Sequence, residues 1–63
     1  MQNYIDAIVV LLEKHNNLTT EQISHRLNID TKTIGGVLWY LEHNRLGVGR
    51  FDFVHWKLYK KIN

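Results

Sequence analysis

Residues 18–41 read LTTEQISHRLNIDTKTIGGVLWYL and contain two helical patterns. The first pattern opens with Thr19 and Gln22, three positions apart, which is the spacing of a capping box. In that motif each of the two side chains accepts a hydrogen bond from the other residue's backbone N–H. The sequence therefore predicts a helix over Thr20–Leu27.

The second pattern begins after a short connection. Asp30 is placed to cap a helix over residues 31–44, because an aspartate oxygen readily accepts a free backbone N–H at a helix start. Asn44 is a residue type that often ends a helix. Two helices joined by about three residues predict a helix-turn-helix. The apolar residues of the second helix recur at helical spacing: Ile34, Val37, Leu38 and Leu41.

A further helix is predicted upstream, over Asn3–His15. Its inward stripe is formed by Ile5, Ile8, Val9 and Leu12. Additional apolar residues lie away from this stripe, so the helix either has a central position or forms a dimer. The predicted interface of a homodimer consists of Tyr4, Ala7, Val10 and Leu11.

Downstream, two short strands are predicted over Leu46–Arg50 and Val54–Tyr59, around a turn at residues 51–53. In the second strand apolar and polar side chains alternate, so that Trp56 belongs to the buried face. The predicted fold class is α+β, with three helices followed by a two-stranded β-hairpin. At 63 residues the chain has room for a single domain over residues 1–63.

The charge of the chain is unevenly distributed. Residues 1–31 hold two basic and four acidic side chains, a net charge of −2, whereas residues 32–63 hold six basic and two acidic ones, a net charge of +4. The second half is therefore the predicted surface for a polyanion.

Several classes of function find no support in the sequence. There is no cysteine, the four histidines lack metal-ligand spacing, and no nucleophile with its base is evident. We predict no enzyme activity, no metal and no cofactor. The longest apolar run has six residues, too short for a signal peptide or a membrane span, so an intracellular location without membrane association is expected.

The helix and hairpin patterns together resemble a known family. LTTEQI at residues 18–23, LNID at 27–30, IxxVLxxLE at 34–42 and the final hairpin look like the winged helix-turn-helix superfamily. The resemblance implies a regulator of transcription that binds double-stranded DNA, and the small size of the chain would suit a viral, phage or microbial regulator. It places helix 31–44 in the major groove and the 46–60 hairpin as a wing. Such domains also serve in protein docking and dimerisation.

A narrower resemblance concerns VLWYL at residues 37–41 and WKL at 56–58, which are similar to the Z-alpha subgroup that binds left-handed nucleic acid. In that comparison Trp39 replaces a contacting tyrosine, and Trp56 matches the wing tryptophan. Lys32 also matches a contact residue of the subgroup. Other contact positions differ here: Gly35 and Gly36 replace an asparagine and an arginine, and Phe53 and Val54 replace two prolines.

The predicted nucleic-acid contacts lie on the outer face of helix 31–44 and on the hairpin. Cations there can bind phosphate or base edges, and Arg50 can reach a phosphate or a minor groove. The predicted contact residues are Thr31, Lys32, Gly35, Gly36, Trp39, His43, Arg50, Trp56, Lys57 and Lys60.

Two adjacent glycines within a helix cost on the order of 1 kcal/mol each, so their presence requires a reason. Either they let DNA or a partner surface approach closely, or Gly35 permits a tight crossing between helices. For the exposed Trp39 there are three alternatives: it packs on Trp56, it contacts nucleic acid, or it anchors a protein partner. The second predicted function is therefore a protein-interaction module, an inhibitor or assembly factor, whose docking surface is Gly35, Gly36 and Trp39.

Overall fold

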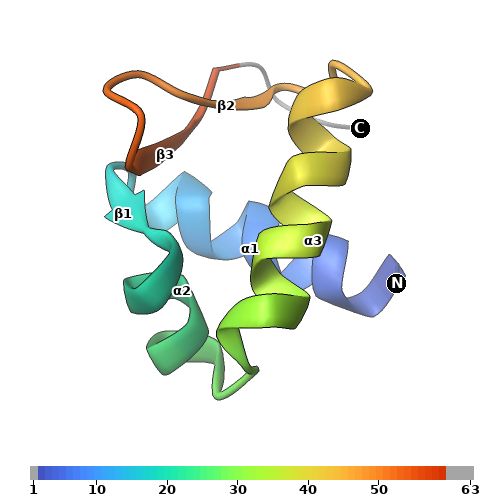
Figure 1. The fold of residues 1–63 in the computed structure, drawn as a ribbon, viewed down its shortest axis with the longest axis vertical. Coiled ribbons are helices and arrows are strands. Elements are labelled where there is room, and N and C mark those ends of the chain that lie inside the picture. Colours follow the sequence, from blue (N-terminus) through green and yellow to red (C-terminus); the bar gives the residue numbers. More distant parts are fainter. Residues whose placement is uncertain (1, 60–63) are drawn as a thin grey trace.

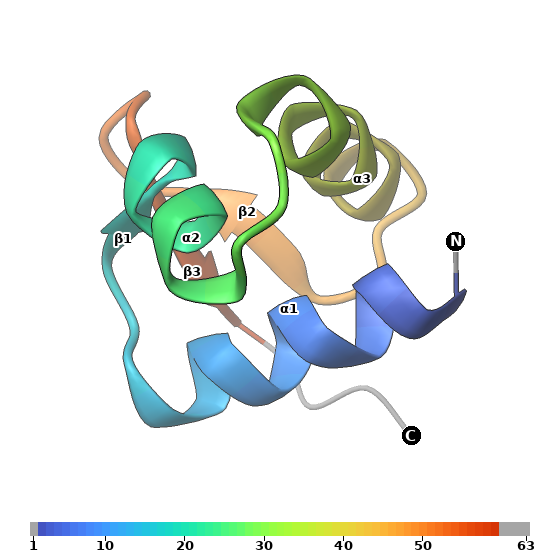
Figure 2. The same cartoon turned by 90° about the horizontal axis from the view of Figure 1, so that it is seen from below.

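The computed structural model describes residues 2–59, which form three helices and a small three-stranded antiparallel sheet (Figure 1). The helices pack against one another and the sheet closes one side of them (Figure 2). Within residues 2–59 no helix has the length and apolar character needed to cross a bilayer. In chain order the elements are α1 (Gln2–Lys14), β1 (Leu18–Thr19), α2 (Thr20–Leu27), α3 (Thr31–His43), β2 (Val48–Arg50) and β3 (His55–Leu58).

The sheet has one strand more than the predicted two-stranded hairpin. β2 and β3 form the expected antiparallel pair, but β1 joins the other edge of β3, which gives the order β1-β3-β2. Leu18 lies opposite Trp56, and Thr19 lies opposite His55. Two residues are too few to show a periodic pattern in a sequence. The prediction of two strands was therefore wrong, because the extended approach to α2 also pairs with β3.

The predicted bounds of the other elements need only small changes. α2 has the predicted limits, α1 lies one residue earlier, and α3 ends one residue earlier with Asn44 as its C-cap. Both hairpin strands are shorter than predicted. Asp52 explains the late start of β3, because its Oδ1 accepts the backbone N–H groups of Val54 and His55 at 3.2 and 2.8 Å.

The capping box at the start of α2 is confirmed. The Thr19 hydroxyl accepts the N–H of Gln22 at 3.1 Å, and Oε1 of Gln22 accepts the N–H of Thr19 at 2.9 Å. At the other end Asn28 adopts the left-handed conformation, with φ 56°. The Ser24 hydroxyl then donates to the Ile29 carbonyl, and this bond holds the turn that leads to α3.

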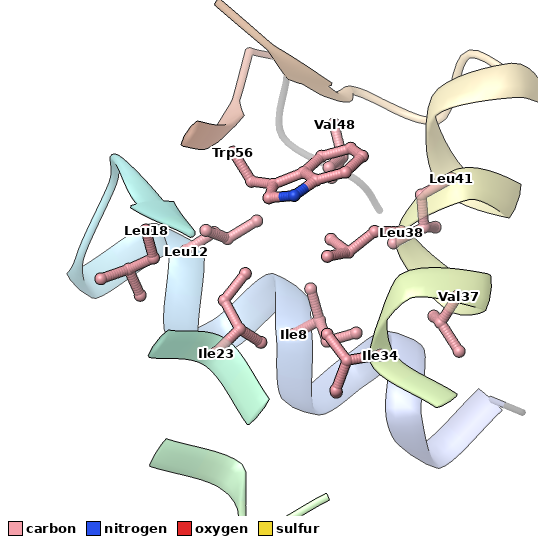
Figure 3. Close-up of a cluster of buried hydrophobic side chains, with 10 residues drawn as sticks. All are labelled: Ile8, Leu12, Leu18, Ile23, Ile34, Val37, Leu38, Leu41, Val48 and Trp56. Atoms are coloured by element: carbon pink, nitrogen blue, oxygen red, sulfur yellow. The ribbon is translucent and has the colours of Figure 1, made fainter. Parts of the chain in front are cut away.

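The core is built from all six elements and consists entirely of apolar residues (Figure 3). The indole of Trp56 lies above the helical side chains, and its Nε1 donates to the Thr20 hydroxyl at 3.0 Å. β3 is thereby joined to the first turn of α2. The buried residues are Ile8, Leu12, Leu18, Ile23, Ile34, Val37, Leu38, Leu41, Val48 and Trp56.

We expect Leu38→Ala to lower the free energy of unfolding by about 2–5 kcal/mol, because Leu38 is fully buried and the substitution leaves a cavity. Urea unfolding followed by circular dichroism measures this change. The matched comparison is Leu46→Ala, since Leu46 is 36% exposed and its loss should cost clearly less than that of Leu38. Equal losses in the two variants would contradict the described core.

Candidate nucleic-acid interface

The start of α3, the helix that carries most of the predicted contacts, is capped by Asp30. Oδ2 of Asp30 accepts the N–H of Thr33 at 3.0 Å, and Oδ1 accepts the Thr33 hydroxyl at 2.8 Å. Both hydrogen bonds favour the ionised carboxylate and lower the pKa of Asp30 below the usual 3.8. The Thr33 hydroxyl has the larger effect and the Thr33 backbone N–H the smaller one. Asp30 is therefore a charged cap at neutral pH.

The apolar stripe of α3 faces the core, which leaves the predicted contact residues on the opposite side. Gly35 is half-buried, whereas the other members of the predicted set on this helix are exposed. Gly36 is thus the more outward of the two glycines, as its helical position predicts. The exposed residues are Thr31, Lys32, Gly36, Trp39 and His43.

Neither glycine is required by packing within the described part of the chain. A Cβ built on Gly35 or on Gly36 would meet no atom within 4 Å, apart from the immediate chain neighbours and the backbone of the helix itself. The tight helix crossing considered for Gly35 is therefore wrong. Gly35 and Gly36 thus form a glycine strip, a part of the α3 surface without side chains. The fold itself gives no reason for it.

Trp39 is 58% exposed and stacks on His43, with 4.3 Å between the ring centroids and 27° between the ring planes. The two residues are four positions apart, so their side chains adjoin on one helix face. His43 also lies 3.9 Å from Glu42. The pair forms an exposed aromatic surface one turn beyond the glycines.

Arg50, predicted to contact phosphate, is engaged within the protein. Its Nη2 donates to Oε1 of Glu42 at 3.1 Å, and its Nε donates to Oε2 at 3.3 Å. Its guanidinium also lies 5.2 Å from the centroid of the Trp56 ring, and Nη1 donates to the Phe53 carbonyl at 3.5 Å. Arg50 thus ties the hairpin to the end of α3, and a phosphate there would meet a guanidinium that is already paired with Glu42.

The three remaining members of the predicted contact set are Trp56, Lys57 and Lys60. Trp56 belongs to the core, so its ring is not part of the exposed face. Lys57 follows it on β3, and its ammonium lies 5.4 Å from the centroid of the Tyr59 ring. Lys60 lies outside the described residues 2–59.

The loop between β2 and β3 is ordered by Asp52, which also lies 2.7 Å from Nδ1 of His55. Burial alone would raise the pKa of Asp52. The N–H groups of His55 and Val54 and the His55 ring outweigh this effect and lower the pKa below its usual value. Next to Asp52, Phe53 is 88% exposed and has φ 76°, a conformation that bulky residues seldom adopt. The loop therefore presents an apolar tip.

Two features of this site were missed in the sequence. Glu42 and Arg50 are eight positions apart and belong to different elements, so no local pattern predicts their ion pair. The Asp52 and His55 pair has a readable signal, since an aspartate in a turn commonly binds the N–H groups that follow it.

The predicted dimer residues all lie on α1. Tyr4 and Val10 are exposed, whereas Ala7 and Leu11 are half-buried. Leu11 in addition packs against the core. The predicted dimer residues therefore lie on a different helix from the predicted nucleic-acid contacts of α3.

Comparison with known proteins assigns no family to the chain. No family model matches it, and no match was found among curated proteins or among solved structures. Within residues 2–59 no group of three or more potential ligands could hold a metal ion. The outer face of α3 and the hairpin beside it remain the candidate functional surface of the chain.

We expect Gly35→Ala and Gly36→Ala each to raise the free energy of unfolding by about 0.5–1 kcal/mol, because alanine favours the helix and meets open space here. Chemical denaturation of the single variants and the double variant measures the gain. A loss of stability in either single variant would show that its glycine makes an internal contact.

Asp30 should make stability depend on pH. The lowered pKa means that its contribution is complete above the unfolded value of 3.8 and is lost as pH falls through the lower folded value. The thermal midpoint should exceed that of Asp30→Ala at neutral pH, and the gap should narrow as the pH falls below 3.8.

The control for this measurement is Asp30→Asn, whose amide oxygen caps the helix but does not titrate. Its advantage over Asp30→Ala should stay constant across the acidic range. A gap between the wild type and Asp30→Ala that does not change with pH would contradict the role of the ionised cap.

Proposed function

We propose that this chain is a winged-helix protein that binds double-stranded DNA as a regulator of transcription. In this proposal α3 enters the major groove, and the β2–β3 hairpin is the wing on the backbone or in the minor groove. The observation that carries the proposal is the open glycine strip on α3. The two glycines have no packing role, yet each makes the outward-facing helix less stable than alanine would.

The shape of α3 supports this reading. The major groove of B-form DNA is about 12 Å wide and admits one helix. Gly35 and Gly36 let the helix backbone approach a groove wall closely, because no side chain extends from either residue. Lys32, one turn earlier on the same exposed side, is positioned for a phosphate or a guanine edge.

Charge supports a polyanion as the partner. The half of the chain that contains α3 and the hairpin carries +4, and the preceding half carries −2. If four phosphates are neutralised, the logarithm of affinity falls against the logarithm of salt concentration with a slope of about −3.6. The Arg50 pair with Glu42 is part of this balance, because a phosphate competes with the carboxylate for the same guanidinium.

A protein partner is the second candidate, favoured by the exposure of Trp39. Beside its stacked neighbour, this indole gives the face an apolar centre of the kind found in binding hot spots. A further variant of the DNA proposal is a Z-alpha-like preference for left-handed nucleic acid, in which Trp39 stands for the contacting tyrosine.

The two tryptophans allow a direct test. Trp56 is buried and Trp39 is exposed, so a change of fluorescence on titration with DNA should report on Trp39 and should disappear in Trp39→Phe. Titrations with random B-form duplex, alternating CG duplex and single strands, at several salt concentrations, separate the candidates. We expect B-form duplex to bind with a dissociation constant of about 10⁻⁴ to 10⁻⁶ M or tighter.

Variants locate the surface. Lys32→Ala should weaken binding and reduce the magnitude of the salt slope by about 1, whereas Lys14→Ala on α1 removes the same charge from another helix and should not. Gly35→Ala/Gly36→Ala should weaken binding about tenfold or more while the fold becomes more stable, because two methyl groups then separate the helix from the groove.

Each other outcome has a defined meaning. No binding to any duplex at low salt would overturn the proposal and favour the protein partner. Binding to alternating CG duplex with inversion of the DNA circular dichroism spectrum would assign the Z-alpha-like variant. Unchanged affinity for DNA in both Lys32→Ala and Arg50→Ala would contradict the proposed orientation of α3 and the hairpin on the duplex.

A further inference from the structure

The turn between β2 and β3 ends in an apolar tip formed by Phe51, Phe53 and Val54. All three side chains are at least half exposed, and Phe53 is 88% exposed, so the rest of the described chain covers little of them. A cleft of about 270 Å³ lies between the tip and the end of α3, and it is lined by Glu42, Arg50, Phe51 and Phe53. Phe53 therefore projects from the hairpin and does not belong to the core.

Phe53 keeps this position against the preference of its own backbone. Its φ of 76° lies in the left-handed region, which glycine and asparagine adopt readily and a bulky residue seldom does. Asp52 holds the turn, because its Oδ1 accepts the N–H groups of Val54 and His55, and Nη1 of Arg50 donates to the Phe53 carbonyl at 3.5 Å. Backbone conformations of this kind cluster at sites of binding and catalysis. An exposed phenylalanine where glycine would fit better thus indicates a contact outside the chain.

The tip lies on the side of the molecule that α3 presents. In Figure 2 the turn between β2 and β3 and the helix α3 are on the same side, opposite α1. Arg50 joins the two, since its guanidinium pairs with Glu42 of α3 at 3.1 Å. A partner that lies along the outer face of α3 is therefore next to the tip.

A DNA duplex accounts for both features of this side, the glycine strip and the apolar tip. While α3 lies in the major groove, the hairpin beside it reaches the backbone or the minor groove. Proteins that bind the minor groove frequently insert an apolar side chain such as phenylalanine between two base pairs. The half of the chain that carries the tip has a net charge of +4, which suits the surrounding phosphates. A lipid surface would accommodate the phenylalanines, but it has no groove for α3.

We propose that Phe53 is a wedge that enters the minor groove and separates two stacked base pairs. This inference rests on the proposed DNA binding and adds to it the feature of the duplex that the hairpin recognises. Pyrimidine–purine steps such as TA unstack easily, whereas runs of A are stiff. The wedge therefore gives the protein a preference for duplexes rich in TA steps, without hydrogen bonds to base edges. Insertion also kinks the duplex, by about 20–90° in proteins that use such wedges.

Two duplexes of equal length test the wedge, one of alternating A and T and one with only A on one strand and only T on the other. They carry the same phosphates and the same base pairs, but only the alternating duplex has TA steps. Fluorescence anisotropy of the labelled duplexes measures the dissociation constants, and energy transfer between dyes at the two ends measures the bend. We expect the wild type to bind the alternating duplex about tenfold more tightly and to bring its ends closer together.

Three variants identify the side chain responsible. Phe53→Asn removes the ring, and asparagine tolerates the left-handed backbone, so this variant should fold but lose both the preference and the bend. Phe53→Leu keeps a bulky apolar side chain and should retain most of both. The control is Tyr4→Asn, which removes an exposed aromatic ring from α1 and should change neither. Circular dichroism of every variant verifies the fold.

The outcomes separate the wedge from the proposed function. No binding of the wild type to either duplex overturns both. Binding without preference or bend, or with a preference that Phe53→Asn retains, overturns the wedge alone. So does an equal loss of affinity for both duplexes in Phe53→Asn, because the ring would then contact the DNA without entering a base step. Binding to phosphatidylserine vesicles that is lost in Phe53→Asn, with unchanged affinity for DNA, would overturn the wedge and assign the tip to a membrane.

Discussion

The burial of Trp56 is the constraint on which the rest of this small structure depends. The indole fills the space between the sheet and the helices, and its N–H binds the Thr20 hydroxyl. Since β3 lies between β1 and β2, the same residue fixes the middle strand of the sheet. The hairpin is thereby held against α2, and Arg50 extends this support to α3 through Glu42.

Much of the fold was predictable because its signals are local. The Thr19 and Gln22 box, the Asp30 cap and the apolar stripe of α3 each lie within a few residues of one another. β1 escaped prediction because a two-residue strand has no period. The alternation in β3 correctly assigned Trp56 to the buried side, but it failed at Val54, where the Asp52 turn takes the backbone N–H.

The candidate site was less predictable, since it depends on what lies around each side chain. A sequence shows two glycines but not the empty space beside them, which only the packing of α3 reveals. The likeness of Trp56 to a wing tryptophan suggested a contact role, and the local alternation suggested burial. Packing agreed with the alternation. Likewise the charge of Arg50 is visible in the sequence, but its engagement with Glu42 needs the fold.

The composition of the core has an evolutionary consequence. Among the described residues none of the buried ones is polar or charged, and apolar cores tolerate exchanges that conserve volume. Such positions can drift in sequence while the architecture persists. The constraints that cannot drift so easily are conformational: the caps at Thr19 and Asp30, the left-handed Asn28 and the bare strip of α3. Distant relatives of this chain should therefore share these caps and backbone conformations more faithfully than the identities of their core residues.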